Sequence, residues 1–266
     1  MIKLYYILKY EFLKFFKSAR GYVLLLTGTV PLIIFLSISA DKAHLEFLAT
    51  ANWVAIQNGL LINYIFYSYV LSIFFTIMVF SDIISNEKTY EFLLVSTSRP
   101  VILLGKIIIT CFLNIILLLE TMMSFLLTLM SYDVPFPPTD QILKAYFTSV
   151  FICFLLVIPL ILFSHTFIIK LGNINSSMAN YLAIFVFFVI PFIIYFSLDE
   201  LQLFRPEMLN YSIHTIVKTL IKSVIIPEAS NITTATQTQT IETIGSIGIV
   251  GYIASLILFS KSSIIN

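Results

Sequence analysis

The residues of this chain best suited to chemistry are charged side chains that gather in one short segment, Asn86–Lys106. Between two long apolar runs, the segment carries five ionisable residues: Glu87, Lys88, Glu91, Arg99 and Lys106. Apolar side chains accompany them: Tyr90, Phe92, Leu93 and Leu94. This mixture is typical of a short amphipathic helix that lies parallel to the membrane. The alternative is an ordinary charged loop that lipid headgroups order.

Catalytic chemistry is not expected of this chain. The histidines His44, His165 and His214 fall in different segments, so no metal or hydrolase constellation is visible. The one Gly-Lys pair is Gly105-Lys106, and the absence of a glycine five positions before Gly105 excludes a phosphate-binding loop of the GxxxxGK type. We therefore expect no catalytic, cofactor-binding or metal-binding residues here, and any ATPase must be a separate polypeptide.

The composition predicts an all-α polytopic membrane protein. Of its 266 residues 59% are hydrophobic and only 11% are charged, whereas soluble domains carry about 25% charged residues. Apolar windows of about 20 residues are long enough to cross a bilayer as helices. We predict one domain, residues 1–266, with six transmembrane helices. They are Gly21–Ala40, Leu60–Phe80, Val101–Met130, Tyr146–Ile169, Met178–Phe196 and Ile244–Ser260.

Orientation follows from the distribution of lysine and arginine. A cytoplasmic N-terminus puts most of the 15 lysines and arginines inside, as the positive-inside rule requires. Both termini are then cytoplasmic, residues 81–105 form a cytoplasmic loop, and residues 197–243 form an extracytoplasmic one. We expect a multi-pass protein of the plasma membrane.

Residues 1–19 are predicted to form an interfacial helix. Apolar side chains recur at spacings of three and four: Leu4, Leu8, Phe12, Phe15 and Ala19. Lys3, Lys14 and Lys17 fall on the other face, so the helix is expected to lie apolar side down on the cytoplasmic leaflet. A basic flank of the first span is the alternative.

The 81–105 loop resembles the signature region of the ABC-2 type transporter permeases, the membrane subunits of one class of ATP-driven exporters. The matching residues are Thr89, Glu91, Leu93, Leu94, Ser98, Arg99, Leu103, Leu104, Gly105 and Lys106. Lys88 replaces the usual glycine, and the proline falls after the arginine, at Pro100, where it fits the first turn of the next helix. Lys106 is expected to extend its ammonium back to the membrane interface. The interfacial helix and the six spans also match the family layout.

The resemblance implies that the loop is a coupling helix, which docks on a separate nucleotide-binding subunit holding ATP and Mg. The partner-docking residues would be Glu87, Lys88, Tyr90, Glu91, Phe92, Leu94 and Arg99. It also implies a dimer with a second copy or a similar permease, and efflux of a substrate. Because the spans consist mostly of Phe, Ile and Leu, we expect an amphiphilic substrate, such as a drug, a peptide or a lipid-like molecule. No nucleic acid partner is expected.

Two spans contain features that need an explanation. Glu120 is the one acid inside a span, in the outer half of the membrane, where it either lines a path or is a neutral or snorkelling carboxyl near the rim. The last span carries small residues that permit close helix approach: Gly248, Gly251 and Ser255. They are expected to pack within the subunit or against a second copy. Pro159 and Pro191 are expected to kink their helices.

The 197–243 loop contains a second amphipathic pattern. Its apolar residues repeat at three and four up to Pro227: Ile213, Ile216, Val217, Leu220, Ile221 and Val224. We expect a helix here that either caps the outer end of the bundle or lies on the outer leaflet. The polar stretch that follows is expected to be a loop.

Two other functions remain compatible with these patterns. A stand-alone secondary transporter or channel needs ionisable groups at the midplane or paired inverted repeats, and Glu120 is the one candidate charge. A membrane anchor that recruits partners through the 81–105 loop would use the same docking helix.

Overall fold

The computed structural model describes residues 2–50, 53–85, 98–171, 185–190, 213–226 and 234–260, together with Leu182 and Ile193. Every regular element among these residues is a helix. The elements are α1 Ile2–Lys17, α2 Ala19–Thr50, α3 Trp53–Ser85, α5 Arg99–Ser131, α6 Thr139–Ile152, η1 Cys153–Val157, α7 Ile158–Leu171, η2 Phe185–Val189, α10 Ile213–Ile225 and α11 Thr234–Ser260.

Five of the described helical segments are long and apolar enough to cross a membrane: Gly21–Lys42, Trp53–Phe80, Pro100–Ser131, Thr139–Phe167 and Thr238–Ser260. Each contains the roughly 20 residues that a bilayer core requires. The chain is thus an all-helical, multi-pass membrane protein, as its composition predicts. The predicted span 178–196 lies mostly outside the described residues.

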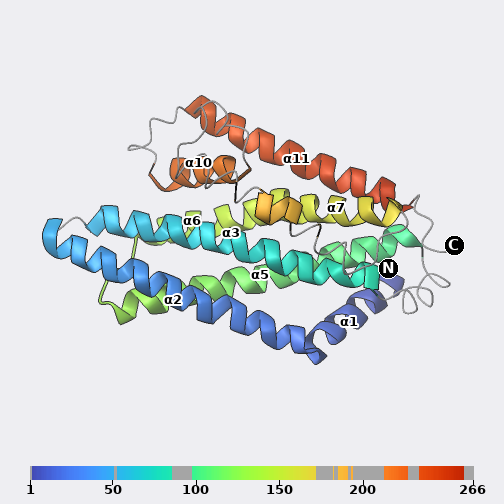
Figure 1. Ribbon diagram of the computed structural model, residues 1–266, viewed down its shortest axis with the longest axis horizontal. Helices are drawn as coiled ribbons and strands as arrows, with labels where there is room; N and C mark the ends of the chain where they lie inside the picture. Colours follow the sequence, from blue (N-terminus) through green and yellow to red (C-terminus); the bar gives the residue numbers. More distant parts are fainter. Residues whose placement is uncertain are drawn as a thin grey trace.

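The helices form an elongated bundle (Figure 1). In it α2, α3, α5 and the α6–η1–α7 segment run along the long axis, and α11 lies beside α7. The start of α1 and the end of α11 lie at the same end of the bundle, which we call the terminal end. The end of α3 and the start of α5 are also there; residues 86–97 between them lie outside the described part of the chain.

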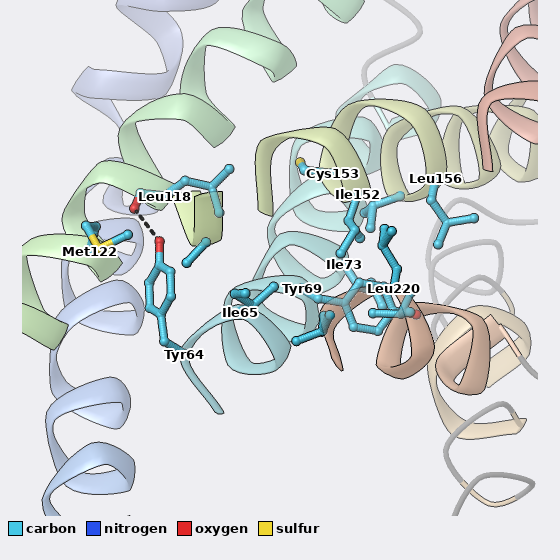
Figure 2. Close-up of a cluster of buried hydrophobic side chains, with 14 of the residues drawn as sticks. Tyr64, Ile65, Tyr69, Ile73, Leu118, Met122, Ile152, Cys153, Leu156 and Leu220 are labelled. Carbon is cyan, nitrogen blue, oxygen red and sulfur yellow. Dashed lines mark hydrogen bonds between the residues drawn. The ribbon is translucent and has the colours of Figure 1, made fainter. Parts of the chain in front are cut away.

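The core lies where α3, η1 and α10 meet. Figure 2 shows Tyr69 and Ile73 of α3 directed toward Leu156 of η1 and Leu220 of α10. All four side chains are buried. Because lipid surrounds a membrane bundle, such contacts stabilise it through close packing rather than through removal of apolar surface from water.

The outer amphipathic helix forms as its apolar repeat predicts. The helix α10 buries Val217, Leu220 and Ile221 and contacts α3, α6 and α11 near the end opposite the termini (Figure 1). The sequence left two positions open for this helix, against the bundle or on the outer leaflet. Helix α10 packs against the bundle.

Two helices extend beyond the boundaries that the sequence predicts. The connection expected at 81–105 is narrowed to 86–98, because α3 continues to Ser85 and α5 begins at Arg99. The prediction of a loop for the polar stretch before the last span is wrong from Thr234 onward, because α11 begins there. The residues added to α3 after Phe80 and to α11 before Ile244 include no glycine or proline, and adding a residue to an existing helix avoids the cost of a new nucleus.

Candidate functional site

The predicted coupling segment falls in the sequence between the end of α3 and the start of α5, which both lie at the terminal end (Figure 1). The docking residues Glu87, Lys88, Tyr90, Glu91, Phe92 and Leu94 lie outside the described residues. Arg99 is the first residue of α5, after Ser98 in an extended conformation and before Pro100. Proline is favoured in the first helical turn, where its missing N–H needs no partner. The segment thus connects directly to two long helices, α3 and α5.

A buried ion pair joins α1 to α5 close to this connection. The Lys106 Nζ lies 2.6 Å from the Glu11 Oε2, and the two residues are only 1% and 6% exposed. The prediction that Lys106 reaches back to the interface is wrong, because Glu11 provides an anionic partner inside the protein. Each charge neutralises the other, so neither is left unpaired in a dry environment.

A glycine allows α1 to approach this closely. A Cβ atom on Gly105 would lie 2.6 Å from the Ile7 Cγ2, far inside van der Waals contact. Ile7 and Ile102 are buried beside it. We call Ile7, Glu11, Gly105 and Lys106 the α1–α5 joint. The Gly-Lys pair that ends the family-like segment therefore supplies the α5 half of this joint.

The joint uses a face of α1 that the sequence analysis left unassigned and that adjoins the predicted membrane-facing stripe. Ile7, Glu11 and Phe15 are buried against the bundle, whereas Phe12 of the predicted membrane-facing stripe is exposed. Sequence reasoning missed this face because Glu11 interrupts its apolar character. The spacing of four between Ile7, Glu11 and Phe15 was the available signal.

The joint is connected to α2 by a tight corner. Only Ser18 separates α1 from α2, and its hydroxyl donates to the Phe15 carbonyl at 2.7 Å. A Cβ on Gly21 would lie 3.1 Å from the Phe15 carbonyl oxygen, so glycine suits this close approach. A displacement of α1 is therefore transmitted to α2.

Glu120 lies where α5 contacts α2. A Cβ on Gly28 would lie 2.5 Å from the Glu120 Oε2, and the Thr29 side chain is a hydrogen-bonding partner of the carboxyl. The Oε2 atom is buried and has no hydrogen-bond partner among the described residues. The residue as a whole is half-buried, and an acid within a long apolar helix remains a candidate for function.

Substituting Gly28 should displace this carboxyl. The Gly28→Ala methyl group would occupy the position of Oε2, and the flexible Glu120 side chain would rotate away from α2. We expect a membrane-permeant carbodiimide to label Glu120 at least severalfold faster in Gly28→Ala, as followed by mass spectrometry.

The matched control is Gly59→Ala, where a new methyl group meets nothing within 4 Å. Its labelling rate should equal that of the wild type, and Glu120→Gln should abolish labelling at this position. Equal labelling rates of Glu120 in Gly28→Ala and Gly59→Ala would contradict the close contact between Gly28 and Glu120.

Polar side chains connect the two helices that flank the loop. The Asn114 Nδ2 of α5 donates to the Thr76 Oγ1 of α3 at 3.2 Å. Farther along, the Ser68 and Thr121 hydroxyls lie 3.4 Å apart. Figure 2 shows the Tyr64 hydroxyl directed at the Leu118 carbonyl of α5, a bond of 3.4 Å. Hydrogen bonds of this kind between membrane helices contribute about 0.6 kcal/mol each. They favour movement of α3 and α5 as one unit.

The predicted small residues of the last span face a distorted part of α7. A Cβ on Gly248 would lie 2.6 Å from the Leu155 carbonyl oxygen, and one on Gly251 would lie 2.9 Å from the Pro159 Cβ. Pro159 has no N–H and removes the donor that the Leu155 carbonyl would have in an α-helix.

The helix accommodates Pro159 with the wider turn η1, Cys153–Val157, as π turns commonly do. The Tyr252 hydroxyl of α11 donates to the Phe154 carbonyl at 2.8 Å, which satisfies one of the displaced backbone groups. The buried Ser255 bonds its own helix through the Gly251 carbonyl. We call Gly248, Gly251 and Tyr252 of α11, with Leu155 and Pro159, the α7–α11 contact.

No group of three or more potential metal ligands is found among the described residues. Comparisons with protein families, with curated proteins and with solved structures found no match to this chain. The functional argument therefore rests on the residues themselves and on their geometry.

Proposed function

We propose that this chain is the membrane permease subunit of an ATP-driven transporter, similar to the ABC-2 type, and that a separate ATPase docks on the segment between α3 and α5. The chain itself is then not an enzyme, and ATP and Mg are held by the partner. The docking residues would be those predicted from Glu87 to Arg99.

The observation that carries the proposal is the α1–α5 joint. Helix α5 begins directly after the docking segment, and within two turns it holds α1 through the Lys106–Glu11 pair. Helix α1 continues through Ser18 into α2. A force applied to the docking segment would therefore move α5, α1 and α2 together, as rigid-body coupling to a closing partner requires. An ordinary charged loop would not need such an attachment.

A sixth span fits the arrangement of the described helices. Helix α7 ends at the terminal end, whereas α10 lies near the opposite end (Figure 1). The intervening residues 172–212 contain the apolar run Met178–Phe196, which is long enough for a crossing. With this crossing, both termini lie on one side of the membrane, which the lysine and arginine distribution makes the cytoplasmic side of the plasma membrane.

The substrate is proposed to be amphiphilic and to be exported by a dimer of this chain or by its pair with a similar permease. The helices present aliphatic and aromatic side chains almost exclusively, which suits a drug, a peptide or a lipid-like molecule. Transport by two such subunits would place a path between them.

One observation favours a second candidate function, a stand-alone secondary transporter. The buried, unpaired Oε2 of Glu120 beside Gly28 is the kind of group that such transporters use to carry a coupling ion. An anchor that recruits other proteins through the same docking segment would be indistinguishable by binding alone.

The test is co-purification with the ATPase encoded nearest to this chain. The wild type should retain the ATPase in detergent, and Glu91→Ala/Leu94→Asp should lose at least nine-tenths of it, because an apolar anchor and a charge are removed from the docking helix. Stimulation of ATP hydrolysis by an amphiphilic substrate would then separate a permease from an anchor.

The matched control changes the same residue types at the other end of the bundle. Asp140 and Phe136 are exposed there, and Phe136→Asp/Asp140→Ala should retain the ATPase. A well-folded wild-type chain that retains no ATPase would remove the permease proposal. In that case, proton-coupled uptake or release that depends on Glu120 becomes the measurement to make.

A further inference from the structure

The outer side of the α1–α5 joint carries an open groove with a volume of about 470 Å³. Its lining comes from both helices: Tyr5, Leu8, Lys9 and Phe12 of α1, and Ile108 and Phe112 of α5. The volume falls within the roughly 300–1,000 Å³ of ordinary small-molecule sites. The rings of Phe12 and Phe112, 6.0 Å apart, close one part of the groove across the two helices.

The lining is apolar except at Lys9. Tyr5, Phe12 and Phe112 are each more than a third exposed, so the groove is open to its surroundings along its length. An alkyl chain is the chemistry that a long, apolar and aromatic groove on a membrane protein fits best. The exposed ammonium of Lys9 makes one side of the groove cationic.

The charge balance of α1 specifies the headgroup. Glu11 is the only acid in α1, and it is buried in the pair with Lys106. The ammonium groups of Lys9 and Lys17 are exposed on the outer surface of the helix. With its one carboxylate internally neutralised, the groove surface is cationic and complementary to an anionic headgroup.

We propose that this groove is a specific site for an anionic phospholipid of the bilayer. The acyl chain lies between α1 and α5 against Phe12, Ile108 and Phe112, and the phosphate binds Lys9. This inference goes beyond the proposed transport function and does not depend on an ATPase partner. Bound lipid would hold α1 against α5 at the α1–α5 joint.

The experiment uses the full chain, delipidated in detergent and titrated with dioleoyl phosphatidylglycerol, with dioleoyl phosphatidylcholine as the neutral comparison. Native mass spectrometry counts the bound lipids per chain. We expect one saturable phosphatidylglycerol site and weaker binding of phosphatidylcholine. Lys9→Gln should weaken phosphatidylglycerol binding about fivefold, the effect of one lysine near an anionic lipid surface.

Lys17→Gln is the matched control for the headgroup, because Lys17 is also exposed on α1 but does not line the groove. It should change the affinity less than twofold. Equal losses in Lys9→Gln and Lys17→Gln would overturn the proposal in favour of diffuse attraction between α1 and anionic lipids.

A second pair of variants tests the part of the groove proposed to bind the acyl chain. Ile108→Trp should fill the groove and abolish the saturable site for both lipids. Leu104→Trp, one turn earlier on α5 and exposed outside the groove, should leave it intact. Unchanged elution and melting temperature exclude misfolding as the cause.

Two other results would also overturn the site. Equal affinity for phosphatidylglycerol and phosphatidylcholine would exclude recognition of the anionic headgroup. A delipidated chain that forms a dimer, which Ile108→Trp breaks and Leu104→Trp does not, would assign the groove to a second copy. Because no ATPase is present in these measurements, their failure would leave the proposed transport function untouched.

Discussion

Replacing Lys106 by methionine is expected to lower the free energy of unfolding by about 3–5 kcal/mol, since it leaves the Glu11 carboxylate buried without its counter-ion. Lys106 is 1% exposed and Glu11 6%, so water cannot solvate the remaining charge without a rearrangement of α1. Thermal unfolding in detergent, followed by near-ultraviolet circular dichroism, measures the loss. Glu11→Met should also be destabilising, because the buried ammonium of Lys106 loses its carboxylate partner.

The double variant Glu11→Met/Lys106→Met provides the control for this prediction. Replacing both members of a buried pair by apolar residues of similar volume is often neutral or stabilising. We expect the free energy of unfolding of the double variant to return to within about 1 kcal/mol of the wild type. The double-mutant cycle should then show strong energetic coupling between Glu11 and Lys106. Additive losses in the double variant would show that the two residues act independently, and the α1–α5 joint would then not depend on the ion pair.

The second large effect is expected at the α7–α11 contact. A methyl group added by Gly248→Ala would lie 2.6 Å from the Leu155 carbonyl oxygen and 3.1 Å from its Cα. These are backbone atoms, so the two helices must separate rather than a side chain rotate. Overpacking of this kind costs about 1–3 kcal/mol, and separation would also break the Tyr252–Phe154 hydrogen bond. A melting temperature measured in the same detergent checks the result.

Gly245 offers a control within the same helix. A Cβ there meets nothing within 4 Å, so Gly245→Ala should be neutral or should stabilise α11 by up to about 1 kcal/mol through helix propensity. The two alanine variants differ only in position. If Gly248→Ala were as stable as Gly245→Ala, close contact between α11 and α7 would be disproved.

The two sites have different roles in the proposed mechanism. The α1–α5 joint attaches the docking segment to α1 and α2, whereas the α7–α11 contact joins two helices that lie beside each other (Figure 1). The wide turn η1 and Pro159 weaken the regular backbone bonding of the helix, and α11 supplies Tyr252 in compensation. Movement imposed at the docking segment is thus expected to act on α2, α3 and α5 and to leave α7 and α11 packed together.

The sequence by itself determined the membrane-spanning, all-helical character and the positions of most long helices. Hydropathy over about 20 residues reports directly on the cost of placing each segment in lipid. Local spacing likewise predicted α10, and Pro100 marked the first turn of α5. These signals are all contained within a few helical turns of the chain.

The tertiary structure alone decided which side chains meet. Glu11 and Lys106 are separated by 95 residues, and Glu120 meets Gly28 across two helices. No local period encodes such pairs, and in a membrane protein an apolar face is equally suited to lipid and to a neighbouring helix. This is why the sequence did not show that Ile7 and Glu11 face the bundle, together with Phe15 of the predicted membrane-facing stripe. The helix ends at Ser85 and Thr234 were missed because local propensity leaves polar sequence as loop, whereas continuing an existing helix needs no new nucleus.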